Sequence, residues 1–321
     1  MITKKTTTFL LDYGIVGILF ILVVFFSIMS ENFLKVTTIF TILRQVSITG
    51  IISIGMCFVI LTGGIDLSVG SIAGVSSVTA AMMMMAGLPS PAACVIAVLI
   101  AVIYGTISGT FITRLNMPPL ICTLGMMTAL RGIAFIITKG LPVFNFSTTF
   151  GNFAKSFLWV VPYPVILLTG IFIIARFILN RTILGRYVYG VGGNLEASRL
   201  SGINVTWIRT FAYTLSGFLS GIAGMVLLSR TNSGQPSSGQ NYEMEAITAV
   251  VLGGVSLSGG QGNISLVMVG VLIMGVLSTG MTMLNINDYY QQLVKGLVLI
   301  AAVAFSSMSK KLQTRINQST T

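Results

Sequence analysis

Two long apolar runs are separated by the stretch Leu61-Thr62-Gly63-Gly64-Ile65-Asp66-Leu67-Ser68-Val69-Gly70, which holds a glycine pair and one carboxylate. Its last eight residues recur 190 positions later as Gly253-Gly254-Val255-Ser256-Leu257-Ser258-Gly259-Gly260, with five of the eight identical. Glycine pairs in apolar sequence interrupt helices or let a second backbone approach closely. The repeat therefore has two interpretations. It is either a pair of interruptions flanking a central pathway, as in transporters with repeated halves, or two glycine-rich turns between consecutive helices.

The apolar runs on either side of these stretches set the fold class. A helix that crosses a bilayer needs about 20 mostly apolar residues. The chain offers ten such runs, at approximately 13–30, 42–62, 67–86, 91–113, 118–138, 163–179, 207–229, 243–258, 263–284 and 289–308. Apolar residues are continuous in these runs and do not alternate as a membrane barrel requires. We therefore predict an all-α membrane protein with about ten transmembrane helices, formed by residues 1–321 as a single domain.

The composition supports this class. Only 8% of the residues are charged, the hydrophobic fraction is 54% and the mean hydropathy is +0.95. These values exclude an ordinary soluble protein and an intrinsically disordered chain, and they make a lipid bilayer the natural solvent. The net charge of +11 is spread thinly between apolar runs, so we expect it to set topology rather than to bind nucleic acid.

The distribution of basic residues predicts the orientation. Ten spans place both termini on one side. With both termini in the cytoplasm, eleven of the 18 Lys and Arg residues fall on or near the cytoplasmic face and five on or near the other. This agrees with the positive-inside rule, which the opposite orientation would violate. Arg131 and Lys295 lie inside spans, where each is expected to reach toward the membrane surface, Lys295 beside Asp288.

Catalytic chemistry is not expected. The chain has no histidine, and its three cysteines, Cys57, Cys94 and Cys122, lie in apolar runs without a metal-binding spacing. There is no phosphate-binding Gly-Lys-Ser or Gly-Lys-Thr sequence and no convergent catalytic pair. We therefore predict no metal, no cofactor and no enzymatic activity.

Asp66 is the one carboxylate clearly associated with the middle of the apolar pattern. An ionisable residue within a membrane is a functional candidate by default. Asp66 either caps the helix that begins at Leu67 or lines a pathway or gate. In an alternative function, an ion-coupled secondary transporter, it would be the proton or sodium site. The pathway or gate candidates are Gly63, Gly64, Asp66, Ser68, Gly253 and Gly254.

The loop at 180–206 is predicted to hold a short helix. Asn194 is a suitable N-cap, Gly202 is suited to the left-handed terminal position, and Glu196 favours the N-terminal end. A seven-residue helix does not persist alone in water. It needs a partner surface, either in its own domain or on another subunit. By the same reasoning, Glu243 and Glu245 are expected to open a helix.

Several separated motifs resemble the membrane permeases of ribose-type ABC sugar importers. They are Ile60–Ser71, Leu184-Gly185-Arg186-Tyr187, Gly192-Gly193-Asn194, Leu200–Val205, Ala249–Gly254 with Ser258-Gly259-Gly260, and Tyr289-Tyr290-Gln291. The resemblance implies a ten-helix permease in the cytoplasmic (inner) membrane that pairs with a second copy or a close paralogue. It also implies a cytoplasmic ABC ATPase subunit, a periplasmic sugar-binding protein, and import of ribose or a related monosaccharide by alternating access.

In such importers a Glu-Ala-Ala-x-x-x-Gly loop docks on the ATPase. Here Glu196-Ala197-Ser198 followed by Gly202 has that spacing, although Ser198 replaces the second Ala and the Ile-x-Leu-Pro tail is absent. The resemblance therefore implies an ATPase-coupling loop that comprises Asn194, Glu196, Ala197, Ser198, Arg199, Leu200 and Gly202.

Overall fold

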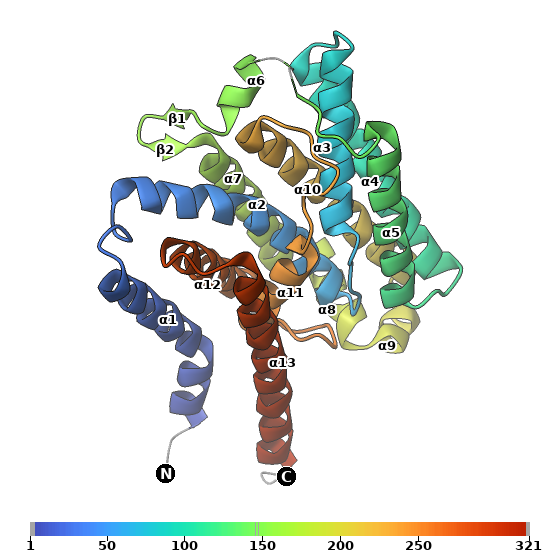
Figure 1. The fold of residues 1–321 in the computed structure, drawn as a ribbon. Helices are drawn as coiled ribbons and strands as arrows, with labels where there is room; N and C mark the ends of the chain where they lie inside the picture. The colour runs from blue at the N-terminus through green and yellow to red at the C-terminus, as the bar shows by residue number, and fades with distance from the viewer. Residues whose placement is uncertain (1–3, 145, 147, 319–321) are drawn as a thin grey trace.

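A computed structural model describes residues 4–144, 146 and 148–318, and most of these are helical (Figure 1). Helices dominate because lipid offers no hydrogen-bond partners, so each backbone group must be satisfied within its own segment. The long helices are α1 (Lys4–Met29), α2 (Val36–Leu61), α3 (Val69–Met85), α4 (Ser90–Arg114), α5 (Pro119–Thr138), α7 (Tyr163–Arg181), α10 (Val205–Thr231), α12 (Ile264–Met283) and α13 (Asp288–Gln318). The predicted all-α class is confirmed.

Four short helices and one small hairpin complete the described part of the chain. The helices are α6 (Thr148–Phe153), α8 (Ile183–Gly193), α9 (Leu195–Leu200) and α11 (Tyr242–Leu252). Strand β1 (Phe157–Leu158) pairs antiparallel with β2 (Val161–Pro162). Both termini lie at the end of the molecule that carries α8 and α9, and the hairpin and α6 lie at the opposite end (Figure 1). We refer to these as the α9 end and the hairpin end.

Six of the described helices are long and apolar enough to cross a membrane, namely α2, α4, α5, α7, α10 and α12. Shorter apolar helices occupy Gly14–Met29 and Val69–Met85. The span predicted at 243–258 is wrong, because α11 ends at Leu252 and has only 11 residues. At 1.5 Å per residue it rises about 16 Å, roughly half of the hydrocarbon thickness.

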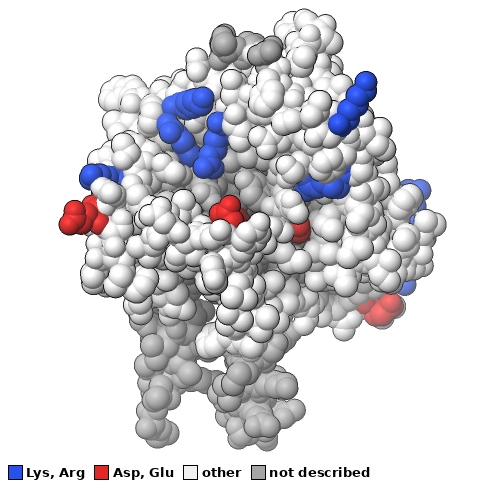
Figure 2. Space-filling view, viewed as in Figure 1, with Lys and Arg blue, Asp and Glu red and all other residues white. Residues whose placement is uncertain are grey.

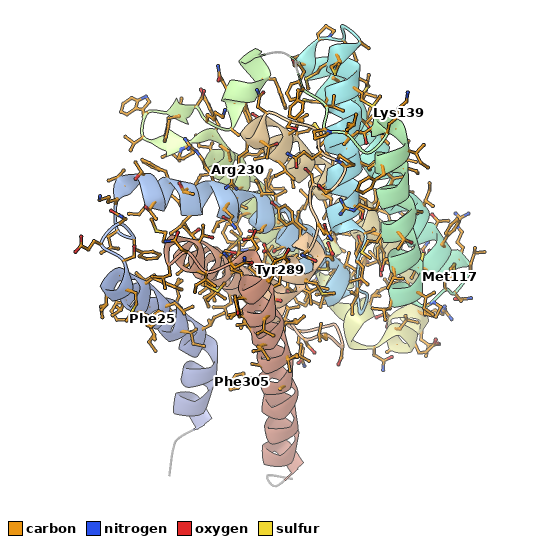
Figure 3. All side chains as sticks on the ribbon, viewed as in Figure 1. Phe25, Met117, Lys139, Arg230, Tyr289 and Phe305 are labelled. Carbon is orange, nitrogen blue, oxygen red and sulfur yellow. The ribbon has the colours of Figure 1, made fainter. Side chains whose placement is uncertain are left out.

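The long helices form an interior group and a peripheral group. In the most apolar stretch of α2, 83% of the residues are buried, and in α10 and α12 the share is 72%; it falls to 33% in α4 and 22% in α5 and α7. Apolar side chains such as Phe25 and Phe305 project from the peripheral surface, as expected for contact with lipid (Figure 3). The predicted spans thus differ in role, with α2, α10 and α12 forming the core.

Small residues let the interior helices approach closely. A Cβ on Gly217 of α10 would lie 2.9 Å from the Cα of Gly105 in α4, and one on Gly224 would collide with the Ala73 carbonyl oxygen of α3. Close backbone approach of this kind is how membrane helices pack where hydrophobic burial gives no drive. α10 therefore serves as the scaffold on which α3 and α4 rest.

Candidate functional site

The first glycine-rich stretch forms the turn from Thr62 to Ser68 between α2 and α3. Gly63 has a φ of +79°, and Gly64 has no room for a side chain because the Tyr213 hydroxyl lies against it. Tyr213 donates a hydrogen bond to the Ile65 carbonyl at 3.4 Å, and Thr123 of α5 donates to the same oxygen at 3.3 Å. The turn is thereby fixed to α5 and α10.

Asp66 is fully buried in this turn and ties it to α10. Its Oδ1 accepts hydrogen bonds from the Ser68 backbone N–H at 3.0 Å and from Ser68 Oγ at 2.6 Å, and its Oδ2 accepts from Ser216 Oγ at 2.8 Å. The predicted cap takes a different form, because α3 begins at Val69 and Ser68 is its N-cap residue. Asp66 therefore accepts hydrogen bonds from the N-cap residue Ser68 and links it to Ser216 of α10.

The second glycine-rich stretch connects α11 to α12. Gly253 ends α11 and packs so closely on Val267 of α12 that a Cβ would lie 2.5 Å from its Cα. Gly254, Gly259 and Gly260 have φ values of +77°, +83° and +72°, which glycine adopts without strain. Both copies of the repeat are thus turns between helices.

The two copies contact each other directly. The Gly260 backbone N–H donates a 2.9 Å hydrogen bond to the Leu61 carbonyl oxygen, and a Cβ on Gly259 would lie 2.8 Å from the Gly63 nitrogen. This contact places the end of α2 against the connection that leads into α12. The internal repeat therefore marks one structural unit rather than two separate turns.

The C-terminal end of α8 is wedged into the same contact. A Cβ on Gly192 would collide with the Leu61 carbonyl oxygen and lie 2.5 Å from the Gly260 nitrogen. Tyr189, one turn earlier, donates a hydrogen bond to the Gly262 carbonyl at 3.0 Å. Burial raises the pKa of Tyr189 to about 12, so this hydroxyl stays protonated and remains a donor. We call the contact among Leu61, Gly63, Gly192, Gly259 and Gly260 the glycine junction.

α9 begins at Leu195, three residues after Gly192 of the junction, and has the predicted caps. Asn194 Oδ1 accepts from the Ala197 N–H at 2.9 Å, and Gly202 has a φ of +81° just after the helix. Ser198 is buried, whereas the Glu196 and Arg199 side chains are 71% and 65% exposed and form a 3.6 Å surface pair. Leu200 is 87% exposed. The helix thus presents two charges and one large apolar side chain outward.

Sequence analysis missed α8, Tyr189 and the serine and tyrosine of α10 that hold the first turn. Thr182 was the available signal, because its side chain accepts a hydrogen bond from the Gly185 N–H as the N-cap of α8. Nothing local in the sequence marks Ser216 or Tyr213, since they reach the turn only through the packing of α10.

The charges inside the helices find internal partners. Arg131 of α5 donates from one Nη to the carbonyl oxygens of Pro236 and Ser238 at 2.8 and 2.7 Å. Lys295 was expected to reach toward the membrane surface beside Asp288, but its Nζ instead donates a hydrogen bond to Glu245 Oε1 of α11 at 2.6 Å. Glu243 and Glu245 do lie in the first turn of α11, as predicted.

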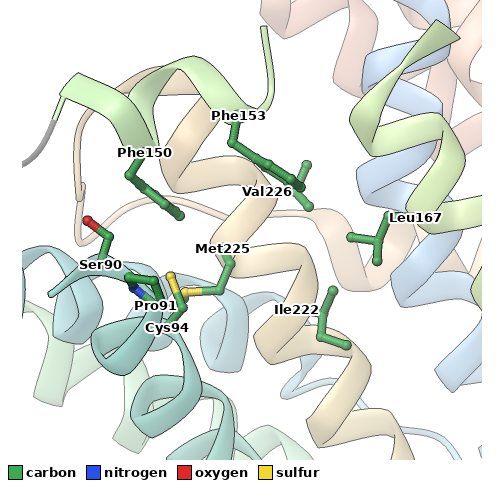
Figure 4. Close-up of a pocket in the computed structure, with 9 residues that line it drawn as sticks. All are labelled: Ser90, Pro91, Cys94, Phe150, Phe153, Leu167, Ile222, Met225 and Val226. Atoms are coloured by element: carbon green, nitrogen blue, oxygen red, sulfur yellow. The ribbon is translucent and has the colours of Figure 1, made fainter. Parts of the chain in front are cut away.

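One cavity lies away from these contacts and another adjoins them. One, of about 570 Å³, is lined by Ser90, Pro91, Cys94, Phe150, Phe153, Leu167, Ile222, Met225 and Val226 (Figure 4). Its nearly uniform apolar lining offers few partners for a ligand rich in hydroxyls. The other, of about 270 Å³, includes Gly253 and Gly254 in its wall. Within residues 4–144, 146 and 148–318, no cluster of three or more His, Cys, Asp or Glu side chains suits a metal ion.

Comparison with known proteins places this geometry in a family context. The family described as branched-chain amino acid transport system / permease component matches residues 38–303. The ribose import permease protein RbsC of Bacillus subtilis (strain 168) is 44% identical over 287 residues, 89% of each chain. RbsC of Escherichia coli (strain K12) is 39% identical, over 93% of this chain and 94% of its own. The D-allose transport system permease protein AlsC of E. coli (strain K12) is 36% identical over 96% of each chain. No solved structure matches this chain.

Proposed function

We propose that α9 is the coupling helix of this chain. The chain belongs to the permease family matched above and is the membrane subunit of an ABC importer for ribose or a related sugar. Such a subunit is a multi-pass membrane protein and not itself an enzyme, because ATP is hydrolysed by a separate ATPase. A substrate-binding protein is the other expected partner.

The surface of α9 supports docking. An exposed leucine next to exposed charges suits an interface whose centre is apolar and whose rim is polar. Leu200 supplies the apolar contact, and Glu196 and Arg199 supply the charges. A six-residue helix is too short to be stable by itself, so a bound partner would also stabilise its conformation.

The glycine junction is the single observation that carries the proposal. Gly192 lies two residues before Asn194, and its backbone rests on Leu61 and Gly260. A displacement of α9 would therefore reach the end of α2 and the α11–α12 connection through backbone atoms without intervening flexible side chains. Packed contacts of this kind shift between arrangements rather than deform continuously. We infer that Gly63, Gly64, Asp66, Ser68, Gly253 and Gly254 belong to a gate moved by this route.

The membrane topology is the second part of the proposal. We propose ten crossings in the cytoplasmic (inner) membrane, with both termini and α9 on the cytoplasmic side. Figure 1 supports this arrangement, because both ends of the chain lie at the α9 end. The crossing through α11 is then made by a short helix together with the chain that precedes it. The hairpin end would face the periplasmic sugar-binding protein.

A second permease subunit completes the proposed transporter. Sugar would cross at the interface of two copies, or of this chain and a close paralogue, by alternating access. Neutral hydroxyl-bearing substrates need a weakly binding route, and the 8% charged content of the chain agrees with that requirement.

Capture of the ATPase subunit tests the coupling assignment. We expect Glu196→Lys and Leu200→Asp to reduce capture of the ATPase by the purified permease, with membrane insertion unchanged. Leu158→Asp introduces the same negative charge as Leu200→Asp, at an exposed leucine of the hairpin end, and serves as the matched control. Capture by the Glu196 and Leu200 variants equal to that of the Leu158 variant would remove α9 from the coupling role.

A further inference from the structure

The chain between α10 and α11 follows α3 through a series of turns. Gly234 packs against Ala81 near the end of α3, and Gly239 packs against Gly70 near its start. The Ser238 N–H donates a hydrogen bond to the Gln235 carbonyl oxygen at 3.0 Å, and the Gln240 N–H donates to the Ser237 carbonyl oxygen at 3.3 Å. Residues 234–239 therefore run along α3 as non-helical, turn-rich backbone.

Small residues and one arginine hold this segment in place. Gly74 of α3 has no room for a side chain, because a Cβ would lie 2.6 Å from the Ser238 carbonyl oxygen. Arg131 donates to two carbonyl oxygens of the segment, and Gly234 exchanges two backbone hydrogen bonds with Val143 at 2.8 and 2.9 Å. The turn-rich segment is thus held by α3, by α5 and by the chain at Val143.

The end of the segment that leads into α11 is expected to lie within the membrane. Gly253 packs against Val267 and Gly270 packs against Ala249, so α11 runs antiparallel to α12. Continued from these contacts, the antiparallel pairing brings the N-terminus of α11 level with about Leu277, roughly two-thirds of the way along α12, which is itself long enough to span. Non-helical backbone at such depth is tolerated only where protein covers it or where it lines a water-filled cavity.

The segment is polar and only partly covered. Ser237, Gln240 and Asn241 are exposed. Among the described residues, the buried oxygens Ser233 Oγ and Glu243 Oε2 at its two ends have no hydrogen-bond partner, which is expected where water completes the bonding. Figure 2 shows a hollow on this face bordered by acidic and basic side chains, and Figure 3 places Arg230 and Tyr289 on the same face.

We propose that residues 234–241, together with the first turn of α11, line the route of the sugar and bind it through hydrogen bonds. This inference rests on the proposed function and names the substrate-facing surface. Hydroxyl and amide side chains both donate and accept, as sugar hydroxyls do. Arg131 is bonded to backbone carbonyls and Glu245 to Lys295, whereas Glu243 keeps one carboxylate oxygen without a partner among the described residues. A surface of hydroxyl and amide groups with one such acceptor suits an uncharged monosaccharide.

Water access is the first test. In the assembled transporter with Cys94→Ala, we expect Ser237→Cys and Gln240→Cys to react with a charged, membrane-impermeant methanethiosulfonate reagent, because the reactive thiolate forms in water. Ile103→Cys is the control, since Ile103 is a 55% exposed apolar position in the middle of α4. At least tenfold faster labelling of the two segment positions is expected. Labelling as slow as that of the Ile103 variant would overturn the proposal.

Uptake is the second test. Gln240→Leu keeps the side-chain size and removes its hydrogen bonds, so we expect ribose uptake per ATP hydrolysed to fall about 2- to 10-fold. Capture of the ATPase should stay unchanged, because the segment is remote from α9. Full uptake by this variant would overturn the segment proposal and leave the coupling proposal intact. Loss of capture in the Glu196→Lys variant tests only the latter.

Discussion

The Gly260 N–H donates a 2.9 Å hydrogen bond to the Leu61 carbonyl oxygen, so the second copy of the internal repeat is bonded to the chain just before the first copy, which begins at Gly63. Leu61 ends α2 and Gly260 precedes α12, and both helices belong to the buried core. Gly192 of α8 rests on both. Three segments distant in sequence are thereby joined through main-chain atoms within a few residues of α9.

Gly192→Ala should separate these segments. The added Cβ collides with the Leu61 carbonyl oxygen, and overpacking of this kind costs about 1–3 kcal/mol. We expect the variant to assemble and hydrolyse ATP while its sugar uptake per ATP falls. Gly193→Ala is the matched control, because a Cβ there meets nothing within 4 Å. Equal coupling ratios in the two variants would show that the junction transmits no motion.

Asp66→Asn should retain transport, whereas Asp66→Ala should lose stability. The amide keeps the size and one acceptor of the carboxylate, and the Ser216 hydroxyl can rotate to accept. Alanine leaves the Ser68 and Ser216 donors buried without a partner, at about 1–3 kcal/mol each. Thermal unfolding in detergent and uptake in vesicles measure the two effects. An Asn variant that inserts normally and has no uptake would instead support an essential protonation at Asp66.

The sequence predictions that were confirmed at α9 rested on contacts between residues close together in the sequence. Asn194 and Gly202 frame α9 through contacts within a few residues, so their roles were visible in the sequence. The contact between the repeat copies was not, because it depends on how α2, α8 and the α11–α12 connection pack together. Nor was the pairing of Lys295 with Glu245, since these residues lie 50 positions apart and α13 meets α11 only in the folded chain.

The failed span at 243–258 has a physical cause. Val255 and Leu257 continue the apolar run, but the helix ends at Leu252 and Gly253 packs on Val267 of α12. The chain upstream of α11, at 234–241, consists largely of turns, and its polar residues lower the local hydropathy. A count of apolar residues does not detect the proposed crossing, which consists of non-helical turns followed by a short helix.

The Lys295–Glu245 pair should stabilise the fold only while both partners are present. Their side chains are 22% and 11% exposed, so each charge is largely removed from solvent. Removing one partner by Lys295→Met should cost about 3–5 kcal/mol because the other charge is left unpaired. Adding Glu245→Gln should recover most of that loss in a double-mutant cycle of thermal stability. Additive losses would mean that the two charges do not interact.

The energy source gives the broadest prediction. In the proposed mechanism, motion reaches the permease from the ATPase through α9 and the glycine junction, so the permease by itself has no energy source for concentrating solute. The purified permease in liposomes should therefore accumulate no ribose under a proton or sodium gradient. Adding the ATPase and the binding protein with ATP inside should produce accumulation that survives collapse of both gradients by ionophores. Uptake by the permease alone, abolished by an ionophore, would instead assign the driving force to an ion bound at a buried group such as Asp66.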